Sequence, residues 1–245
     1  MADKHPMLGI LGGLGPMSTV YFCELLTAHT QAFCDADHID MIISSRASTP
    51  DRTAFILGNS TFDPRPVMIG EAERLVRAGA EILVIPCNTA HYFYEGLARE
   101  CPVPILNIIR ETVQLLKKNG VRCFGLLATE GTVRSEAYGR VCREMGVECV
   151  CPTEQEQAIV THAIYECIKQ GKPVDAAAMS GVCASLLSRG CEVLVLGCTE
   201  LSLLKKQSIL NAPLVDSLEV LAYRTIRACK KTPVGFPTSF WEDEK

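Results

Sequence analysis

With 245 residues, 48% of them apolar, the chain is long enough to bury a well-filled core in one large or two small domains. Its formal net charge of −4 and the lack of a basic stripe argue against a protein that binds nucleic acid or anionic membranes, because both attract basic surfaces. No apolar run approaches the ~20 residues of a transmembrane helix, and the N-terminus lacks the apolar region of a signal peptide, so we expect a cytoplasmic protein.

Apolar runs and helical stretches alternate from one end of the chain to the other. Eight runs are short and continuously apolar, and we expect strands there: residues 7–11, 40–44, 81–86, 104–108, 122–128, 147–151, 192–197 and 213–217. Between them lie stretches that we expect to be helices, several ending at glycine: residues 71–80, 135–146 and 176–190. Continuously apolar strands are typical of parallel sheets covered on both faces. The alternation therefore predicts an α/β fold.

The second half of the chain repeats the first. Three pairs of segments match in the same order, at offsets of 109 to 116 residues: 8–15 with 124–131, 79–89 with 190–200, and 104–107 with 213–216. This is a single duplication without the short period of a solenoid. It predicts two similar, doubly wound, mainly parallel-sheet domains. We expect an N-terminal α/β domain of residues 1–103 plus 212–245 and a C-terminal α/β domain of residues 104–211.

Cys87 and Cys198 occupy the same position in the longest matching pair, and each directly follows an apolar run. Ligands of open α/β sheets bind beyond the carboxyl ends of the strands, so the duplication would place both thiols in one cleft between the domains. Two facing thiols can take a proton from one face of a carbon and return one to the other face, as a racemase or epimerase does. A helix N-terminus or a nearby cation lowers a cysteine pKa from ~8.5, so we expect lowered pKa values at both turns. The alternative is that both are packed strand-end residues.

The other cysteines, among thirteen in the chain, form no dense disulfide-like framework. Cys149 and Cys151 lie close to Cys142, but they lack the C-x2-C pairs or histidine partners of a tetrahedral zinc site, so we expect no metal. The glycine-rich segment at residues 9–15 has neither the G-x-G-x-x-G spacing of a dinucleotide fold nor a P-loop lysine. We therefore expect no cofactor.

Motifs that cover nearly the whole chain carry a family resemblance: GILGGLGP (9–16), TPDRTAFILG (49–58), DPRP (63–66), PCNTAH (86–91), LLATEGT (126–132), PTEQEQ (152–157), IYECIKQG (164–171) and GCTE (197–200). In this order they resemble the cofactor-independent aspartate/glutamate racemase family, and within it the aspartate racemases. The resemblance implies an isomerase that racemises aspartate without pyridoxal phosphate. Its implied partners are a small acidic amino acid, as the substrate, and a second copy of the chain in a homodimer. The resemblance also implies that Cys198 acts on the L-enantiomer and Cys87 on the D-enantiomer.

Residues beside the two cysteines fit a substrate with two carboxylates. The motif matches imply that Arg52 and Lys169 bind the acidic side chain, since arginine offers a bidentate fork and lysine a point charge. Hydroxyl and amide groups at the strand ends can donate to the α-carboxylate, where charge builds as the proton leaves, or can simply cap turns: Asn88, Thr89, Thr129, Thr132 and Thr199.

Four further residues belong to the same pattern. Glu200 directly follows the Cys198-Thr199 pair and could hold the substrate ammonium or tune the neighbouring thiol, although a carboxylate raises a thiol pKa. His91 and the strand-end glycines, Gly12 and Gly13, are expected to support the site. Glutamate racemases of cell-wall synthesis carry an Asp-Ser pair in place of Gly12-Gly13 and a histidine in place of Glu200, which disfavours that assignment. A racemase of glutamate or a substituted aspartate, and a non-catalytic protein that binds acidic amino acids, remain as alternatives.

Overall fold

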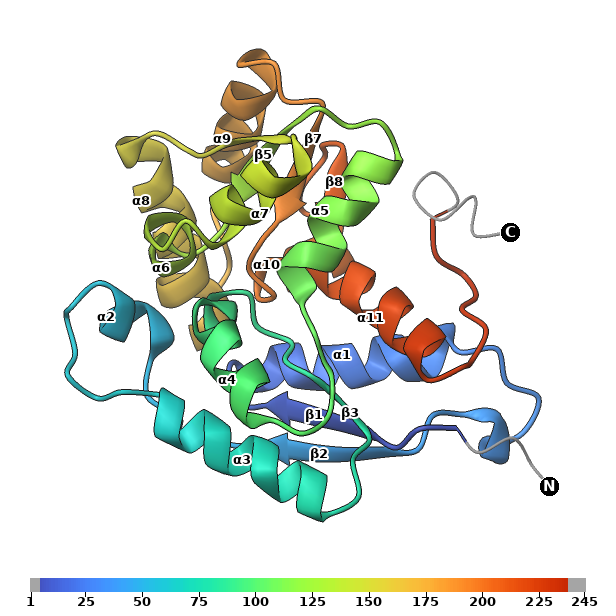
Figure 1. Cartoon of the computed structure of the whole chain (residues 1–245). Helices are drawn as coiled ribbons and strands as arrows, with labels where there is room; N and C mark the ends of the chain where they lie inside the picture. The colour runs from blue at the N-terminus through green and yellow to red at the C-terminus, as the bar shows by residue number, and fades with distance from the viewer. Residues whose placement is uncertain (1–4, 238–245) are drawn as a thin grey trace.

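The chain folds around two four-stranded sheets whose strands all run parallel (Figure 1). In this computed structural model residues 5–237 are described, so residues 1–4 and 238–245, the outer ends of the expected N-terminal domain, lie outside the described residues. The strand orders are β2-β1-β3-β4 and β6-β5-β7-β8, which are the same order counted within each half. The predicted α/β architecture with two similar, doubly wound sheets is confirmed.

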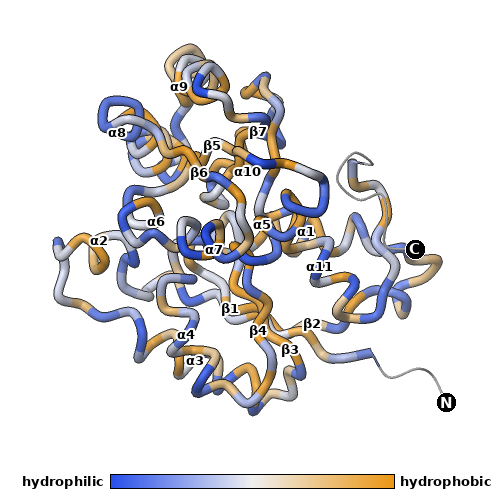
Figure 2. The backbone as a smooth tube through the Cα atoms, turned by 45° about the horizontal axis from the view of Figure 1, so that its top comes forward, coloured by the Kyte–Doolittle hydropathy of each residue, from blue (hydrophilic) through white to orange (hydrophobic). Residues whose placement is uncertain are grey.

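All eight predicted strands are present, and each overlaps its expected range. The first sheet contains β1 (Leu8–Gly12), β2 (Met41–Ser45), β3 (Ile82–Val84) and β4 (Ile105–Leu106). The second contains β5 (Cys123–Leu127), β6 (Glu148–Val150), β7 (Val193–Leu196) and β8 (Leu214–Asp216). The central strands β1, β3, β5 and β7 are almost wholly buried, and the apolar residues of the strands run through the middle of the molecule (Figure 2).

Helices follow the strands and cover the sheets. In chain order they are α1 (Pro16–His29), α2 (Arg52–Ile56), α3 (Arg65–Arg77), α4 (Tyr94–Glu100), α5 (Ile108–Lys118), α6 (Glu130–Arg134), α7 (Ala137–Met145), α8 (Glu154–His162), α9 (Ala176–Ser188), α10 (Leu201–Lys206) and α11 (Ser217–Ala228). The stretch predicted as a helix at 71–80 begins earlier, with α3. Gly146 ends α7 in the left-handed conformation, at φ 69°, as expected for a helix that stops at glycine.

The duplication extends to the way in which helices begin. Asn107 and Asp216 end the matched segments 104–107 and 213–216, and each caps the helix that follows. The Asn107 side chain accepts hydrogen bonds from the first turn of α5, and the Asp216 side chain accepts one from the first turn of α11. Each cap satisfies N–H groups that have no partner within the helix. The residue at this position therefore caps a helix in both halves.

Strand pairing divides the chain at different residues from those of the predicted domains. β4 pairs with β3 in the first sheet and β8 pairs with β7 in the second, whereas the predicted ranges placed residues 104–106 in the C-terminal domain and residues 212–216 in the N-terminal domain. The reason is that each duplicated unit ends with its own fourth strand. The helix after β8, α11, packs against both α1 and α5 and joins the two halves. The division into folding domains itself stays a prediction.

Candidate active site

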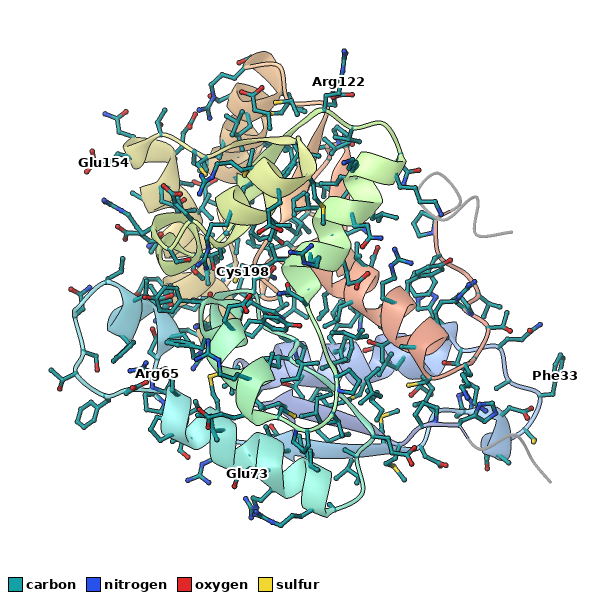
Figure 3. The ribbon with its side chains drawn as sticks, in the orientation of Figure 1. Phe33, Arg65, Glu73, Arg122, Glu154 and Cys198 are labelled. Carbon is teal, nitrogen blue, oxygen red and sulfur yellow. The ribbon has the colours of Figure 1, made fainter. Side chains whose placement is uncertain are left out.

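Cys87 and Cys198 lie on equivalent turns, after β3 and β7, at the boundary between the two halves of the molecule. Figure 3 places Cys198 at this central position, far from the other labelled residues. Only 6% of Cys87 and 4% of Cys198 is exposed. Both cysteines line one pocket with free space of about 10 Å³, which is room for about one water molecule. The duplication has brought two thiols to one enclosed site.

The pocket collects most of the residues predicted from the sequence. Nine of them line it: Arg52, Cys87, Asn88, Thr89, Thr129, Lys169, Cys198, Thr199 and Glu200. Four lining residues were not predicted as site residues: Leu14, Asp51, Thr53 and Tyr165. Asp51 and Tyr165 stand inside two of the family motifs, TPDRTAFILG and IYECIKQG. Their positions within those motifs were the signal that could have identified them.

Three threonines form a ring of hydrogen bonds at the contact between the halves. The Thr89 hydroxyl lies 2.9 Å from the hydroxyls of both Thr129 and Thr132, which are 3.0 Å from each other. Thr129 also caps α6, because its hydroxyl accepts a hydrogen bond from the Thr132 N–H. Thr132 does not line the pocket and completes the ring behind the other two. The ring presents rotatable hydroxyl groups to the pocket beside Cys87.

Arg52 is a buried cation that binds only backbone carbonyl groups within the described part of the chain. It is 8% exposed, and its guanidinium donates to the carbonyl oxygens of Leu14 at 2.7 Å, Pro50 at 3.0 Å and Thr49 at 3.3 Å. Its Nε has no hydrogen-bond partner in residues 5–237. A buried charge without a counterion is costly, by several kcal/mol. An anion in the pocket would compensate this charge.

Lys169 approaches the pocket from the other half of the molecule. It lies in an irregular segment that directly follows α8, in which residues Ala163–Cys167 form a π-helical turn and Ile168–Gln170 a 3-10 turn. Its ammonium lies 4.0 Å from the Asp51 carboxylate and 4.1 Å from the ring centre of Tyr165. Turns of this kind often occur at functional sites. Arg52 and Lys169 thus bring two positive charges to one pocket.

Glu200 contacts the Cys198 thiol directly. The Cys198 Sγ donates a hydrogen bond to the Glu200 Oε2 at 3.0 Å, and both residues are buried. Thr199 donates to the carbonyl oxygen of Pro86 in the other half, at 3.3 Å. The Cys198 turn is therefore held between a carboxylate of its own half and the backbone of the Cys87 turn.

The environment raises the pKa of both thiols, which is opposite to the sequence-based prediction. Burial raises the pKa of Cys87, and Arg52 opposes this effect. Burial raises the pKa of Cys198 further, and Glu200 adds to the rise. The prediction of lowered values was wrong because it considered the strand-to-helix turn without the depth at which the turn is buried. At neutral pH both thiols are protonated in this structure.

Asn88 and His91 support the Cys87 turn. The Asn88 amide donates to Ser217 at 2.9 Å, and its carbonyl accepts from Tyr138 at 2.8 Å, so both of its ends are bonded to the other half. The His91 Nδ1 lies 2.8 Å from the Cys87 carbonyl oxygen, and its Nε2 accepts from the Ile108 N–H at 3.3 Å. Burial lowers the His91 pKa to about 4, so the ring is neutral at neutral pH and donates from Nδ1.

A larger outer pocket adjoins the one that contains the cysteines. Its volume is about 440 Å³. Four charged residues line both pockets: Asp51, Arg52, Lys169 and Glu200. The remaining wall of the outer pocket is largely apolar and includes Met17, Ile168 and Leu203. The charged residues therefore stand between the cysteines and a space large enough for a small molecule.

The two predicted strand-end glycines shape the loop after β1 and do not reach the cysteines. A Cβ added at Gly12 would collide with the Thr19 side chain, and Gly13 has φ 81° with the backbone of Arg46 beside it. Gly13 lines the outer pocket, whereas Gly12 lines neither pocket. The loop is packed against neighbouring backbone, which explains why it needs glycine.

The sequence matches one known protein family over most of its length. The sequence profile described as Asp/Glu/hydantoin racemase matches residues 11–225. The chain belongs to this family. Within residues 5–237, this racemase-family chain has no helix of the length and apolar character required to cross a membrane.

Three relatives show how far the similarity of this racemase-family chain extends. The structure is similar to an aspartate racemase of Picrophilus torridus, with TM-score 0.80 and 28% identity over 96% of this chain and 98% of that one. It is also similar to an aspartate racemase homologue of Pyrococcus horikoshii OT3, with TM-score 0.74 and 27% identity over 93% and 100%. By sequence, it is 28% identical over 225 residues to the broad specificity amino-acid racemase RacX of Bacillus subtilis (strain 168), covering 90% of this chain and 96% of that protein.

Proposed function

We propose that this protein is an aspartate racemase that needs no pyridoxal phosphate and that moves the Cα proton between Cys87 and Cys198. The observation that carries the proposal is Arg52. A buried guanidinium with an unpartnered Nε, in the wall of a pocket that two cysteines also line, supports an anionic substrate. Because arginine matches a carboxylate geometrically, we assign the substrate's side-chain carboxylate to Arg52, with Lys169 as the second cation.

The chemistry requires stabilisation of the charge that builds on the α-carboxylate when the Cα proton leaves. Hydroxyl groups that are already oriented can supply this stabilisation without reorganising during the reaction. Thr89 and Thr129 line the pocket and are held by each other and by Thr132. We assign the α-carboxylate to these hydroxyls. Thr199 and Asn88 hold the two cysteine turns in register through bonds to the opposite half.

Each turnover transfers one proton in and one proton out. One cysteine, as thiolate, forms an S–H bond with the proton that leaves Cα, and the other cysteine, as thiol, gives its proton to the opposite face of the carbanion. The products are the other enantiomer and a cysteine pair with exchanged protonation states. Burial raises the pKa of both thiols, but Arg52 opposes the rise at Cys87 and Lys169 opposes it at both cysteines, so these cations support the thiolate that starts the reaction.

Substrate entry requires the pocket to open. Free space of about 10 Å³ does not hold an amino acid. The Lys169–Asp51 contact, at 4.0 Å, crosses between the second half and the first on the side of the outer pocket. We assign entry to this side, with the irregular helical segment around Lys169 as the part that moves. A homodimer is also part of the proposal and rests on the family resemblance, and so is a cytoplasmic location, which rests on the expectation from the sequence.

A broader range of acidic amino acids is the second candidate function. The outer pocket of about 440 Å³ would accept a longer or substituted side chain next to Arg52 and Lys169. One of the relatives, RacX, is described as a broad specificity amino-acid racemase. A panel of L-amino acids that includes glutamate and β-substituted aspartates, followed by chiral chromatography, would distinguish this candidate from an enzyme restricted to aspartate.

The proposal is tested by incubating L-aspartate with the purified protein in heavy water, without any added cofactor. We expect D-aspartate that carries deuterium at Cα, because the incoming proton comes from a thiol that exchanges with solvent. Saturable binding of aspartate without deuterium incorporation or inversion would support the alternative of a non-catalytic binding protein. Neither binding nor inversion of any acidic amino acid would contradict the proposal.

A further inference from the structure

We propose that Glu200 is a proton-relay residue, which exchanges the proton of Cys198 with solvent between turnovers and so resets the cysteine pair. This inference rests on the proposed two-cysteine racemisation. A molecule of L-aspartate leaves the pair with its protonation states exchanged. Before a second molecule of L-aspartate can react, one cysteine must gain a proton and the other must lose one. A buried thiol needs a path for that exchange.

The contacts of Glu200 supply the inner end of such a path. Its Oε2 accepts the hydrogen bond from the Cys198 thiol at 3.0 Å, so the proton has one short step to travel. Cys198 is 4% and Glu200 7% exposed, and the surrounding protein keeps bulk water away from the sulfur. In the forward step the Cys198 S–H bond breaks and a Glu200 O–H bond forms, while the Cys87 thiolate gains a proton from a water molecule in the pocket that the two cysteines share. The proton on Glu200 then passes to the solvent and replaces the proton that the water gave. In the reverse step the carboxylic acid returns its proton to the thiolate.

The two pockets supply the outer end of the path. Glu200 lines the small cysteine pocket and also the outer pocket of about 440 Å³. Met17, another wall residue of the outer pocket, is 63% exposed, so this pocket opens at the surface. A Cβ built on Gly15 would lie 2.5 Å from the Glu200 Oε1, which shows that a glycine makes space for the carboxylate here. Water in the outer pocket can therefore take the proton from Glu200 or replace it.

The duplication provides an internal comparison for this assignment. The residue equivalent to Glu200 in the other half is Thr89, two positions after Cys87. The Thr89 hydroxyl is hydrogen-bonded to the hydroxyls of Thr129 and Thr132. Unlike a carboxylate, a threonine hydroxyl does not exchange its charge state with solvent at neutral pH. Only the Cys198 turn carries an acid two residues after its cysteine. The fold of the shared turn therefore does not require a carboxylate at this position.

Two rates separate a relay from the other roles that Glu200 could have. Net racemisation of pure L-aspartate requires a reset after every turnover. Exchange of isotopic label between L- and D-aspartate in a racemic mixture requires none, because each enantiomer restores the protonation state that the other one uses. A residue that binds the substrate ammonium, or that only maintains the fold, changes both rates together. A relay changes the ratio of the two rates.

The experiment compares wild type with Glu200→Gln, which keeps the size of the side chain but cannot carry a proton. We expect the ratio of the saturated net rate to the equilibrium exchange rate to fall at least about tenfold, within the range of general acid–base effects. A high concentration of formate buffer should partly restore the net rate of this variant. Glu200→Asp, which keeps a carboxylate, should give an intermediate ratio. Glu24→Gln, which removes a partly exposed carboxylate paired with Lys206, is the matched control and should leave the ratio unchanged.

Each other outcome overturns the relay. An equal fall of both rates with a raised KM would assign Glu200 to the substrate ammonium, and unchanged rates would leave it without a role in proton transfer. If the wild type itself does not racemise any acidic amino acid, the proposed function fails. That result is distinct from a wild-type racemase whose Glu200→Gln variant keeps the normal ratio of rates, in which case only the relay fails.

Discussion

The Cys87 turn and the Cys198 turn share one backbone pattern but differ in their charged neighbours. Burial raises the pKa of both thiols; Arg52 opposes this rise at Cys87, while the Glu200 carboxylate adds to it at Cys198 and accepts the hydrogen bond of that thiol. When the pair loses one of its two protons, Cys87 is therefore the cysteine that becomes the thiolate. Duplication is thus enough to place two thiols on equivalent turns, while single side chains near each thiol give the two cysteines different environments.

The supports of the two turns show the same combination of symmetry and difference. His91 lies four residues after Cys87, and its ring connects the carbonyl oxygen of Cys87 to the first residue of α5. Ser202 lies four residues after Cys198 and donates to Asp216, the cap of α11, at 2.8 Å. Each turn is thus tied to the beginning of the helix that follows the fourth strand of its half. The two connections differ in residue type and in bonds, because His91 contacts the Ile108 N–H itself and Ser202 contacts the side chain that caps α11.

The largest expected effect comes from removing either thiol. Cys87→Ala and Cys198→Ala should each lower net racemisation of aspartate at least about 10³-fold, because general acid–base groups contribute factors of 10² to 10⁴. The matched control is Cys183→Ala, since Cys183 is equally buried but lies outside both pockets. Chiral chromatography measures the rate, and circular dichroism checks folding. Racemisation at the wild-type rate in either variant would remove that cysteine from the mechanism.

Arg52→Gln should affect activity and stability in opposite directions. We expect kcat/KM for aspartate to fall about 10²- to 10³-fold. The substrate carboxylate would lose its buried charged partner, and such a loss typically costs a few kcal/mol of binding free energy. We also expect the free energy of unfolding without ligand to stay equal or rise, because a buried guanidinium without a counterion is removed. Steady-state kinetics and denaturant unfolding measure the two effects. A large loss of stability with unchanged kcat/KM would show that Arg52 has a purely structural role.

The pH dependence should follow the raised thiol pKa values. Below its pKa, the thiolate fraction of a cysteine rises tenfold per pH unit, so we expect kcat/KM to rise with pH between 7 and 9 for both enantiomers. Because Glu200 raises the pKa of Cys198 more than that of Cys87, Glu200→Gln should shift the profile of one enantiomer to lower pH more than that of the other. Profiles that are flat from pH 7 to 9 would mean that substrate binding creates the thiolate by another route.

The smallest effect on activity, and a distinct effect on stability, is expected at His91. The folded state holds its pKa at about 4 against 6.5 for the free side chain, so its stabilisation is complete above pH 6.5 and is lost as the pH falls toward 4. The loss corresponds to about 3 kcal/mol. His91→Gln should flatten the unfolding free energy over this pH range, while the same change at the exposed His162 should not. Equal pH dependence in wild type and His91→Gln would contradict this account.

The sequence predicted most of the fold because buried parallel strands are continuously apolar, and the repeated segments showed how two sheets are related. It did not predict which sheet contains β4 and β8, since strand pairing depends on contacts between distant parts of the chain. In the site, the cysteines and Arg52 could be predicted from their motifs. The direction of the thiol pKa shifts could not, because burial is a property of the assembled halves and not of a local turn.

Separate exchange measurements on the two enantiomers test the central claim most directly. Cys198→Ala and Cys87→Ala are each incubated with pure L- or pure D-aspartate in heavy water, and loss of the Cα proton is followed by NMR. We predict that Cys198→Ala exchanges only the D-enantiomer and Cys87→Ala only the L-enantiomer, each without inversion, because one thiol reaches one face of Cα. A single variant that exchanges both enantiomers would contradict the assignment of one cysteine to each face.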